Sequence, residues 1–236
     1  MFVISMLLFL PLDLFGQVIL VNPGIADRER LVYIERSGGT SQEIVQESRK
    51  IMRDGRAYFE VTGTSDHFQS RFLIDVETLA CIYSETQSRE SEITIKRTTE
   101  LVENKSVPKP DELVITDQNG LQFALRGFPW NSQKSARLSF LGAGRALSSE
   151  TASSDSSSSN LAFNLKVLGK EEIVAAGHKW MCWKLEMGVS GFWGTFFKKA
   201  YFWYGADAPY AMIKFEGVLG PPGTPAKTVE LVSYSN

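Results

Sequence analysis

Apolar and polar residues alternate with a period of two along most of the chain, and this pattern predicts a protein built of β-strands. In residues 57–62, Phe59 and Val61 alternate with Glu60 and Thr62. Successive side chains of a strand point to opposite faces of a sheet, so the alternation is typical of a strand with one buried and one wetter face. The same pattern recurs in residues 72–77, 93–98, 137–140 and 161–167. Because no helices alternate with these segments, the pattern favours an antiparallel sheet over a parallel α/β sheet.

Short glycine-containing turns separate the predicted strands. Asp54-Gly55 and Ala176-Gly177 have the composition of tight hairpin turns, because glycine adopts the positive φ angle that such turns need. Further turn signals stand at residues 37–39, 63–66 and 220–223. This spacing predicts one sheet of about ten strands.

One segment, residues 116–131, changes to the period of a helix. Its apolar residues recur at intervals of three and four: Leu121, Ala124, Leu125 and Phe128. This spacing places them on one face of a short helix. Thr116 or Asp117 is the expected N-cap, and Gly127 followed by Pro129 is expected to end the helix.

The first residues have the composition of a secretory signal peptide. Residues 2–10 form an apolar run that is too short to span a bilayer as a helix, and Gly16 offers a small residue for cleavage. No Lys or Arg precedes the run, so the usual basic start is missing and a buried N-terminal strand is the alternative. The sequence therefore predicts export to the periplasm or the extracellular space. The expected parts are a signal peptide, an N-terminal extension and a single β-rich domain, at residues 1–16, 17–29 and 30–236.

The charge balance argues against nucleic acid as a partner. The formal net charge is −2, and Lys and Arg are scattered rather than clustered. Apolar residues make up 43% of the chain and charged residues 22%, as in folded globular proteins. Residues 148–160 are the exception, since this Ser-rich stretch is too polar to bury a core. They are expected to form a disordered loop within the domain.

The sequence contains no motif of a catalytic or metal site. His67 and His178 are the only histidines, and neither has a second ligand at metal spacing. Nucleophile motifs and phosphate-binding glycine motifs are also missing. Cys81 and Cys182 lie in apolar, strand-like contexts, where we expect buried thiols rather than a disulfide. We therefore expect a protein that is not an enzyme and needs no cofactor or metal, with an unrecognised hydrolase-type activity as the alternative.

The most distinctive motifs lie in the C-terminal third. Residues 167–187 (VLGKEEIVAAGHKWMCWKLEM) read as two strands, and YFWYGADAP and ELVSYSN follow. The N-terminal half contains DGRAYFEVTG, FLIDVETLACIYSE and DQNGLQFALRGFPW. Together these motifs resemble a family of exported bacterial proteins known only as a domain of unknown function, over residues 30–234.

This resemblance implies the half-barrel of periplasmic lipoprotein carriers. Such a fold is a single strongly curved antiparallel sheet whose concave face holds an apolar cavity, with one short helix across it. The resemblance carries over no catalytic residue, because the family has none assigned. It makes the expected fold class mainly β.

The segment GFWGTFFKKAYFWY, residues 191–204, has large apolar side chains on both faces of its predicted strand. Phe196, Phe202 and Tyr204 share one parity, and Phe197, Tyr201 and Trp203 share the other. A half-barrel covers only its concave face, and leaving such side chains in water would forfeit about 1.5–3 kcal/mol each. We therefore predict an apolar or lipid-like ligand between sheet and helix, in contact with Leu125, Trp183, Phe197, Tyr201 and Trp203.

The sequence leaves other ways of covering that face undecided. A partner protein docked on the aromatic face would make the protein an envelope scaffold, and Trp203 and Tyr204 would also suit contact with a membrane surface without spanning it. Terminal segments folded back over the face, or ordinary core packing, are further alternatives. A carrier hides its aromatic side chains around a cavity, whereas a scaffold exposes them as a patch of several hundred Å².

Overall fold

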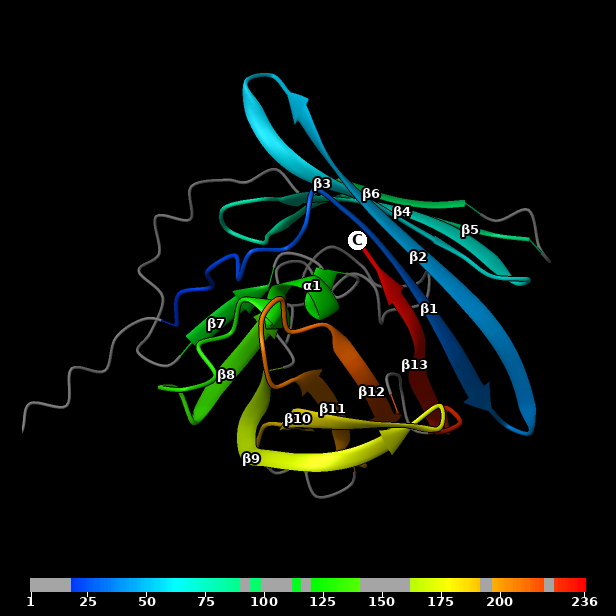
Figure 1. Ribbon diagram of the computed structural model, residues 1–236, viewed down its shortest axis with the longest axis vertical. Coiled ribbons are helices and arrows are strands. Elements are labelled where there is room, and N and C mark those ends of the chain that lie inside the picture. The colour runs from blue at the N-terminus through cyan, green and yellow to red at the C-terminus, as the bar shows by residue number, and fades with distance from the viewer. Residues whose placement is uncertain are drawn as a thin grey trace, which may run out of the picture.

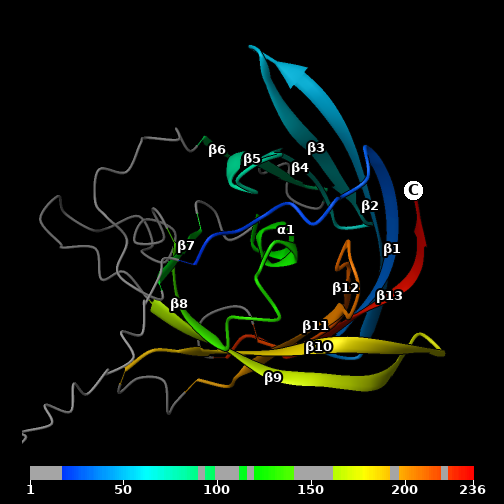
Figure 2. The same cartoon turned by 60° about the vertical axis from the view of Figure 1, so that its left-hand side comes forward.

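The computed structural model consists of one long curved sheet and a single short helix among the residues that it describes. These are residues 18–89, 94–98, 112–115, 120–140, 162–191, 197–218 and 223–236. The expected signal peptide at 1–16 and the expected Ser-rich loop at 148–160 lie outside them. The sheet curls around the helix α1 (Leu121–Arg126), so that α1 lies on its concave side (Figures 1 and 2). The predicted fold class is confirmed.

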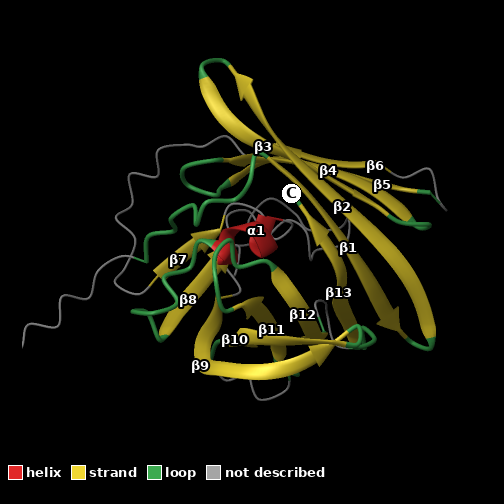
Figure 3. Ribbon diagram, viewed as in Figure 1, coloured by secondary structure: helices red, strands yellow, loops and turns green. Residues whose placement is uncertain are grey.

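Thirteen strands form this sheet, in the order β6-β5-β4-β3-β2-β1-β13-β12-β11-β10-β9-β8-β7 (Figure 3). In the N-terminal half the strands are β1 (Arg28–Ser37), β2 (Thr40–Arg53), β3 (Arg56–Thr64), β4 (Phe68–Asp75), β5 (Cys81–Ser88) and β6 (Thr94–Thr98). The others are β7 (Glu112–Ile115), β8 (Ser135–Phe140), β9 (Ala162–Ala175), β10 (His178–Val189), β11 (Ala200–Gly205), β12 (Met212–Gly217) and β13 (Lys227–Ser235). The sheet therefore has more strands than the approximately ten expected from the turn signals.

Tight turns explain why most neighbours in the chain are also neighbours in the sheet. Asp54 and Gly55 have φ angles of 50° and 77°, and Ala176 and Gly177 have 47° and 82°. Two consecutive residues with positive φ form the turn that suits the twist of a β-hairpin. These turns join β2 to β3 and β9 to β10 as antiparallel pairs.

One pair departs from the antiparallel pattern. Strand β7 runs parallel to β8, and α1 lies between them in the chain. A parallel pair needs a crossover connection, and here α1 forms part of that crossover. The chain therefore enters α1 from β7 and leaves it to β8, two strands at one edge of the sheet. The helix lies across the concave face.

The helix forms where the sequence predicts it. All four residues of its predicted apolar stripe are buried, and the helix ends at Gly127. Gly120 is the N-cap, without a side-chain hydrogen bond, whereas the expected caps Thr116 and Asp117 lie outside the described residues. A Cβ at Gly120 would lie 2.5 Å from Cβ of Cys81. Glycine thus lets the start of α1 approach β5 closely.

The N-terminal segment lies beside α1 and helps to cover it (Figure 2). Val18 and Ile25 are buried in the core, and the backbone N–H of Val21 donates to the carbonyl oxygen of Gly127 at 3.1 Å. The sequence analysis left undecided whether a terminal segment folds back over the aromatic face. Here the N-terminal segment folds back over α1.

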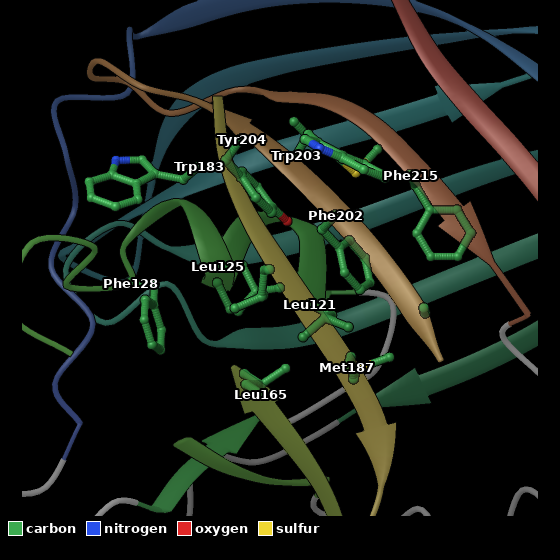
Figure 4. Packing of buried hydrophobic residues seen from close by; sticks show 14 of the residues in the cluster. Leu121, Leu125, Phe128, Leu165, Trp183, Met187, Phe202, Trp203, Tyr204 and Phe215 are labelled. Carbon is green, nitrogen blue, oxygen red and sulfur yellow. The ribbon is translucent and has the colours of Figure 1, made fainter. Parts of the chain in front are cut away.

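The core consists of two clusters of buried side chains. The larger lies between α1 and strands β1 and β7–β13 (Figure 4), and the smaller lies under β3, β4 and Phe123. Cys182 belongs to the larger cluster and Cys81 to the smaller one, and no disulfide links them. Among the described residues, no helix has the length and apolar character needed to cross a membrane.

Candidate functional site

A cavity of about 480 Å³ lies between α1 and the concave face of the sheet. Side chains from β1–β5, β11–β13 and α1 line it. Most of its walls are apolar, including Phe72, Phe123, Phe202, Phe215 and Val229. Its volume is typical of pockets that bind small molecules, and its lining has the usual predominance of apolar side chains with a few polar groups.

Strand register arranges the floor of the cavity in rows. Phe202, Phe215, Val229, Glu35 and Gln42 are paired in sequence across five adjacent strands, from β11 to β2. Paired residues of adjacent strands share a face, so this row changes from apolar at β11 to polar at β2. The floor is therefore amphipathic along one direction.

The polar end of the cavity is built around the carboxylate of Glu35. Nε2 of Gln42 donates to its Oε1 at 2.9 Å, and Nζ of Lys227 donates to its Oε2 at 2.9 Å. The side chains of Glu35 and Lys227 are 14% and 35% exposed. The ammonium group of Lys227 thus lies at the edge of the cavity, and the carboxylate lies deeper.

A buried ion pair holds the C-terminal end of α1 to the sheet. The guanidinium of Arg126 donates from both terminal nitrogens to the carboxylate of Glu29, at 2.7 and 2.9 Å. The two side chains are 2% and 0% exposed. Nε of Arg126 donates to the carbonyl oxygen of Pro209 at 3.0 Å, and the hydroxyl of Tyr234 donates to Glu29 at 2.9 Å. Burial and the bond to Glu29 raise the pKa of Tyr234 to about 12.

A second set of polar contacts holds the middle of the helix. Nε2 of Gln122 donates to the hydroxyl oxygen of Tyr33 at 2.9 Å, and the hydroxyl of Tyr204 donates to the carbonyl oxygen of Gln122 at 3.2 Å. Burial raises the pKa of both tyrosines well above the ordinary value. Both hydroxyls therefore stay neutral at physiological pH.

The structure does not bring the five predicted ligand-binding residues around one cavity. Leu125 and Trp183 are buried on the helix side of the sheet (Figure 4). Trp183 stacks there on Trp130 at 6.2 Å between ring centroids. Trp203 and Tyr201 lie on the opposite face of β11, since alternate residues of a strand point to opposite faces and Tyr204 reaches α1. Phe197, which is half-buried, precedes β11. None of the five lines the 480 Å³ cavity.

Lysine side chains of the neighbouring strands cover the second aromatic face. Lys184 on β10 and Lys214 on β12 are the paired neighbours of Trp203. Their ammonium groups lie 5.1 and 5.6 Å from its ring centroid, and Lys184 also lies 5.5 Å from the ring of Tyr201. Long lysine stems cover apolar surface while the charged ends stay near water, and the ammonium groups are attracted to the aromatic faces. With this cover, Trp203 is only 6% exposed.

The indole of Trp203 also donates a hydrogen bond to the carboxylate of Glu171. Its Nε1 donates to Oε1 of Glu171 at 2.7 Å, and this bond is the main reason why the pKa of Glu171 lies below its ordinary value, with Lys184 adding to it. We expect Trp203→Phe to raise the pKa of Glu171, because phenylalanine offers no N–H donor. Carbon-13 NMR titration of the carboxyl groups measures the change, with Tyr201→Phe as the control. An unchanged pKa in Trp203→Phe contradicts this assignment.

Catalytic chemistry finds little support among the described side chains. No group of three or more His, Cys, Asp or Glu residues in this part of the chain is placed to hold a metal ion. Burial raises the pKa of Cys182 to about 12, so its thiol stays protonated at neutral pH. A thiol is a weak nucleophile compared with the thiolate.

Sequence reasoning missed the polar end of the cavity. Glu35 shares its parity with the buried Leu31 and Tyr33 on β1. Lys227 likewise shares its parity with the buried Val229 and Leu231 on β13. A charged residue at the end of an inward-facing apolar row is the signal that points to such a site.

No protein-family model matches the sequence, and no relative is found among curated proteins. Among solved structures, the chain is similar to a β-barrel-like protein of the domain of unknown function DUF1849 from Brucella abortus. The identity is 10% and the TM-score 0.39, over 92% of this chain and 98% of that one. A DUF1329 family protein from Desulfovibrio piger shows 9% identity and a TM-score of 0.33, over 91% and 86% of the chains.

A third similar structure is described as a candidate exported protein with a YmcC-like fold, from Bacteroides fragilis. It shows 9% identity and a TM-score of 0.34, over 94% of this chain and 100% of that one. Two of the three neighbours are thus named for domains of unknown function and one as exported.

Proposed function

We propose that this protein is a non-catalytic, exported binding protein that holds an apolar, lipid-like molecule in the cavity beneath α1. The observation that carries the proposal is the 480 Å³ cavity, whose walls are mostly apolar and include a few polar groups. A cavity of this volume between a helix and a sheet is large enough to take a small apolar molecule.

The cavity walls are held in place from two sides, which favours binding. Arg126 and Gln122 fasten α1 to strands β1 and β11 through buried hydrogen bonds. A preformed site loses less conformational entropy when a ligand enters than a site that must first be ordered. The helix would thus act as a fixed cover.

A scaffold that docks a partner through aromatic side chains has less support. The exposed large apolar side chains of the described residues are all non-aromatic: Ile19, Val21, Met52, Leu168, Val174, Met181 and Val232. They lie on several different elements, and single exposed apolar residues are common on protein surfaces. Within the described part of the chain, these side chains therefore form no aromatic patch.

Filling the cavity is expected to abolish binding. Ile44 lies on the cavity floor and is half-buried, so Ile44→Trp places an indole where the ligand would lie. We expect the affinity for N-phenyl-1-naphthylamine to fall about tenfold or more, which corresponds to 1.4 kcal/mol or more of lost binding free energy. Fluorescence titration of the purified protein measures the change, and native mass spectrometry shows whether a lipid-sized mass co-purifies.

The neighbouring residue offers a matched control. Val45 lies on the other face of the same strand, so Val45→Trp adds the same side chain outside the cavity and should leave the affinity within about twofold. Circular dichroism checks that both variants keep the sheet. Equal affinities in Ile44→Trp and the unmodified protein, or no binding by the unmodified protein, would contradict the proposed function.

A further inference from the structure

A second cavity, of about 550 Å³, lies on the outer face of the sheet, which is the face turned away from α1. Residues of β1, β2 and β3 line it, together with the end of β13. Arg28 and Arg30 line it from the two positions next to Glu29. Because the carboxylate of Glu29 reaches Arg126 on α1, its neighbours in the strand point the other way. We call this space the outer cavity.

Two arginines lie directly opposite each other on the wall of the outer cavity. Arg28 on β1 is paired with Arg49 on β2, so the two side chains share a face and start about 5 Å apart. Like charges directly opposite each other destabilise a sheet. Arg30 follows on the same face, about 7 Å farther along β1. Three guanidinium groups therefore start from neighbouring positions of one cavity.

The acidic residues of the outer cavity do not balance these charges. Three glutamates also line it, but two of them bind arginines that lie outside it. Glu29 pairs with Arg126. Glu60 accepts a hydrogen bond from Nε of Arg71 at 2.9 Å as well as one from Nε of Arg49 at 2.6 Å. Even with the terminal carboxylate of the last residue counted, the lining residues and their ion-pair partners have a net positive charge.

The guanidinium of Arg28 is free to bind a ligand. Its side chain is exposed, and it forms no ion pair or hydrogen bond with any other residue of the described part of the chain. Arg30 is held only loosely, since its Nε lies 3.5 Å from Oε1 of Glu47 and both side chains are at least 49% exposed. Glu60 contacts Nε and Nη2 of Arg49 and leaves Nη1 unused. Each of the three arginines thus has N–H groups left for an anion.

A phosphate group fits this set of donors. A guanidinium presents its N–H groups in a planar fork that matches the oxygens of a phosphate, and such charge-assisted hydrogen bonds are strong. A phosphate monoester has a charge of about −1.5 to −2 at neutral pH and three acceptor oxygens, so it can accept from more than one arginine. The hydroxyls of Thr62 and Ser235 also line the outer cavity and can donate to it.

We propose that the outer cavity binds a phosphate group, with Arg28 as the guanidinium that has no other partner and Arg30 and Arg49 beside it. The proposal is independent of the cavity beneath α1, because it concerns the opposite face of the sheet. The phosphate belongs either to a small molecule in solution or to the headgroup of an anionic lipid, and the recognition chemistry is the same for both.

Calorimetric titration of the purified full-length protein with inorganic phosphate tests the proposal. The titration is done at pH 7.5 and low ionic strength, because salt screens charges at a protein surface. We expect binding by the unmodified protein and an affinity about tenfold lower in Arg28→Gln, as the loss of a hydrogen bond between charged groups predicts. Arg28 has no ion pair to lose, so this variant should keep the fold, which circular dichroism checks.

Arg53→Gln is the matched control. Arg53 lies on β2, where its side chain is 63% exposed and pairs with Asp54, and it does not line the outer cavity. The substitution removes the same charge from the protein as Arg28→Gln. It should leave the affinity for phosphate within about twofold of that of the unmodified protein.

Vesicles distinguish the two sources of the phosphate. A lipid headgroup is indicated if the protein sediments with phosphatidylglycerol vesicles but not with phosphatidylcholine vesicles, and if Arg28→Gln weakens this binding while Arg53→Gln does not. A soluble phosphate compound is indicated if inorganic phosphate binds with the same dependence on Arg28 and the vesicles do not bind. The proposal is overturned if neither probe binds, or if the two variants weaken binding equally, since the attraction would then depend only on overall charge.

Discussion

Arg126→Met is expected to lower the free energy of unfolding by about 3–5 kcal/mol, because it leaves the carboxylate of Glu29 buried without its partner. Glu29 is 0% exposed and accepts both terminal nitrogens of Arg126. The hydroxyl of Tyr234 alone remains to bond that carboxylate. Urea unfolding followed by tryptophan fluorescence measures the loss.

An exposed arginine of the same sheet provides the control. Arg49 pairs with Glu60, but its side chain is 66% exposed, and Glu60 also accepts a hydrogen bond from Arg71. Arg49→Met should therefore cost no more than about 1 kcal/mol. The double variant Arg126→Met, Glu29→Leu should cost less than the two single changes added together, because it buries no unpaired charge. Equal losses in Arg126→Met and Arg49→Met would show that the buried pair does not hold α1.

Trp130→Ala is the second change with a large expected effect. Trp130 is 1% exposed, and its ring lies 5.2 Å from those of Phe128 and Tyr204 and 6.2 Å from that of Trp183. Removing it opens a cavity in the core directly after α1, at a cost of about 3–5 kcal/mol in the free energy of unfolding. Thermal and urea unfolding measure this change.

A conservative substitution at the same position separates packing from hydrogen bonding. Nε1 of Trp130 is buried without a partner, so Trp130→Phe loses no hydrogen bond and should be clearly less destabilising than Trp130→Ala. If both substitutions destabilise the protein equally, ring packing is not what Trp130 contributes. Val174→Ala changes a side chain that is 58% exposed and should stay within about 0.5 kcal/mol.

The strands and the helix could be predicted because their patterns are local. Alternation in residues 57–62 and the apolar stripe from Leu121 to Phe128 each span fewer than ten residues, and burial of one face is enough to select them. The parallel pairing of β7 with β8 leaves no such mark, because it depends on where the crossover through α1 lies. The alternation of apolar and polar residues therefore indicated the strands, but it could not show whether two adjacent strands run parallel or antiparallel.

Single charged residues of the candidate site leave a signal in the sequence, but their meeting could not be predicted because it depends on long-range pairing. Glu35 and Lys227 are 192 residues apart, and Glu29 and Arg126 are 97 apart. The covering of Trp203 by Lys184 and Lys214 depends in the same way on the registers of β10 and β12 with β11. The excess of aromatic residues was visible in the sequence, whereas the lysines opposite them became visible only with that register.

The order of the strands has a consequence for how the chain folds during synthesis. β1 and β13 are the first and last described strands along the chain, yet they lie side by side in the middle of the sheet. Until β13 has left the ribosome, β1 and β12 each present an unpaired edge, which is a template for wrong pairing. The sheet is then completed by insertion of a strand at its centre, so we expect the nascent chain to need protection from aggregation until β13 has been synthesised.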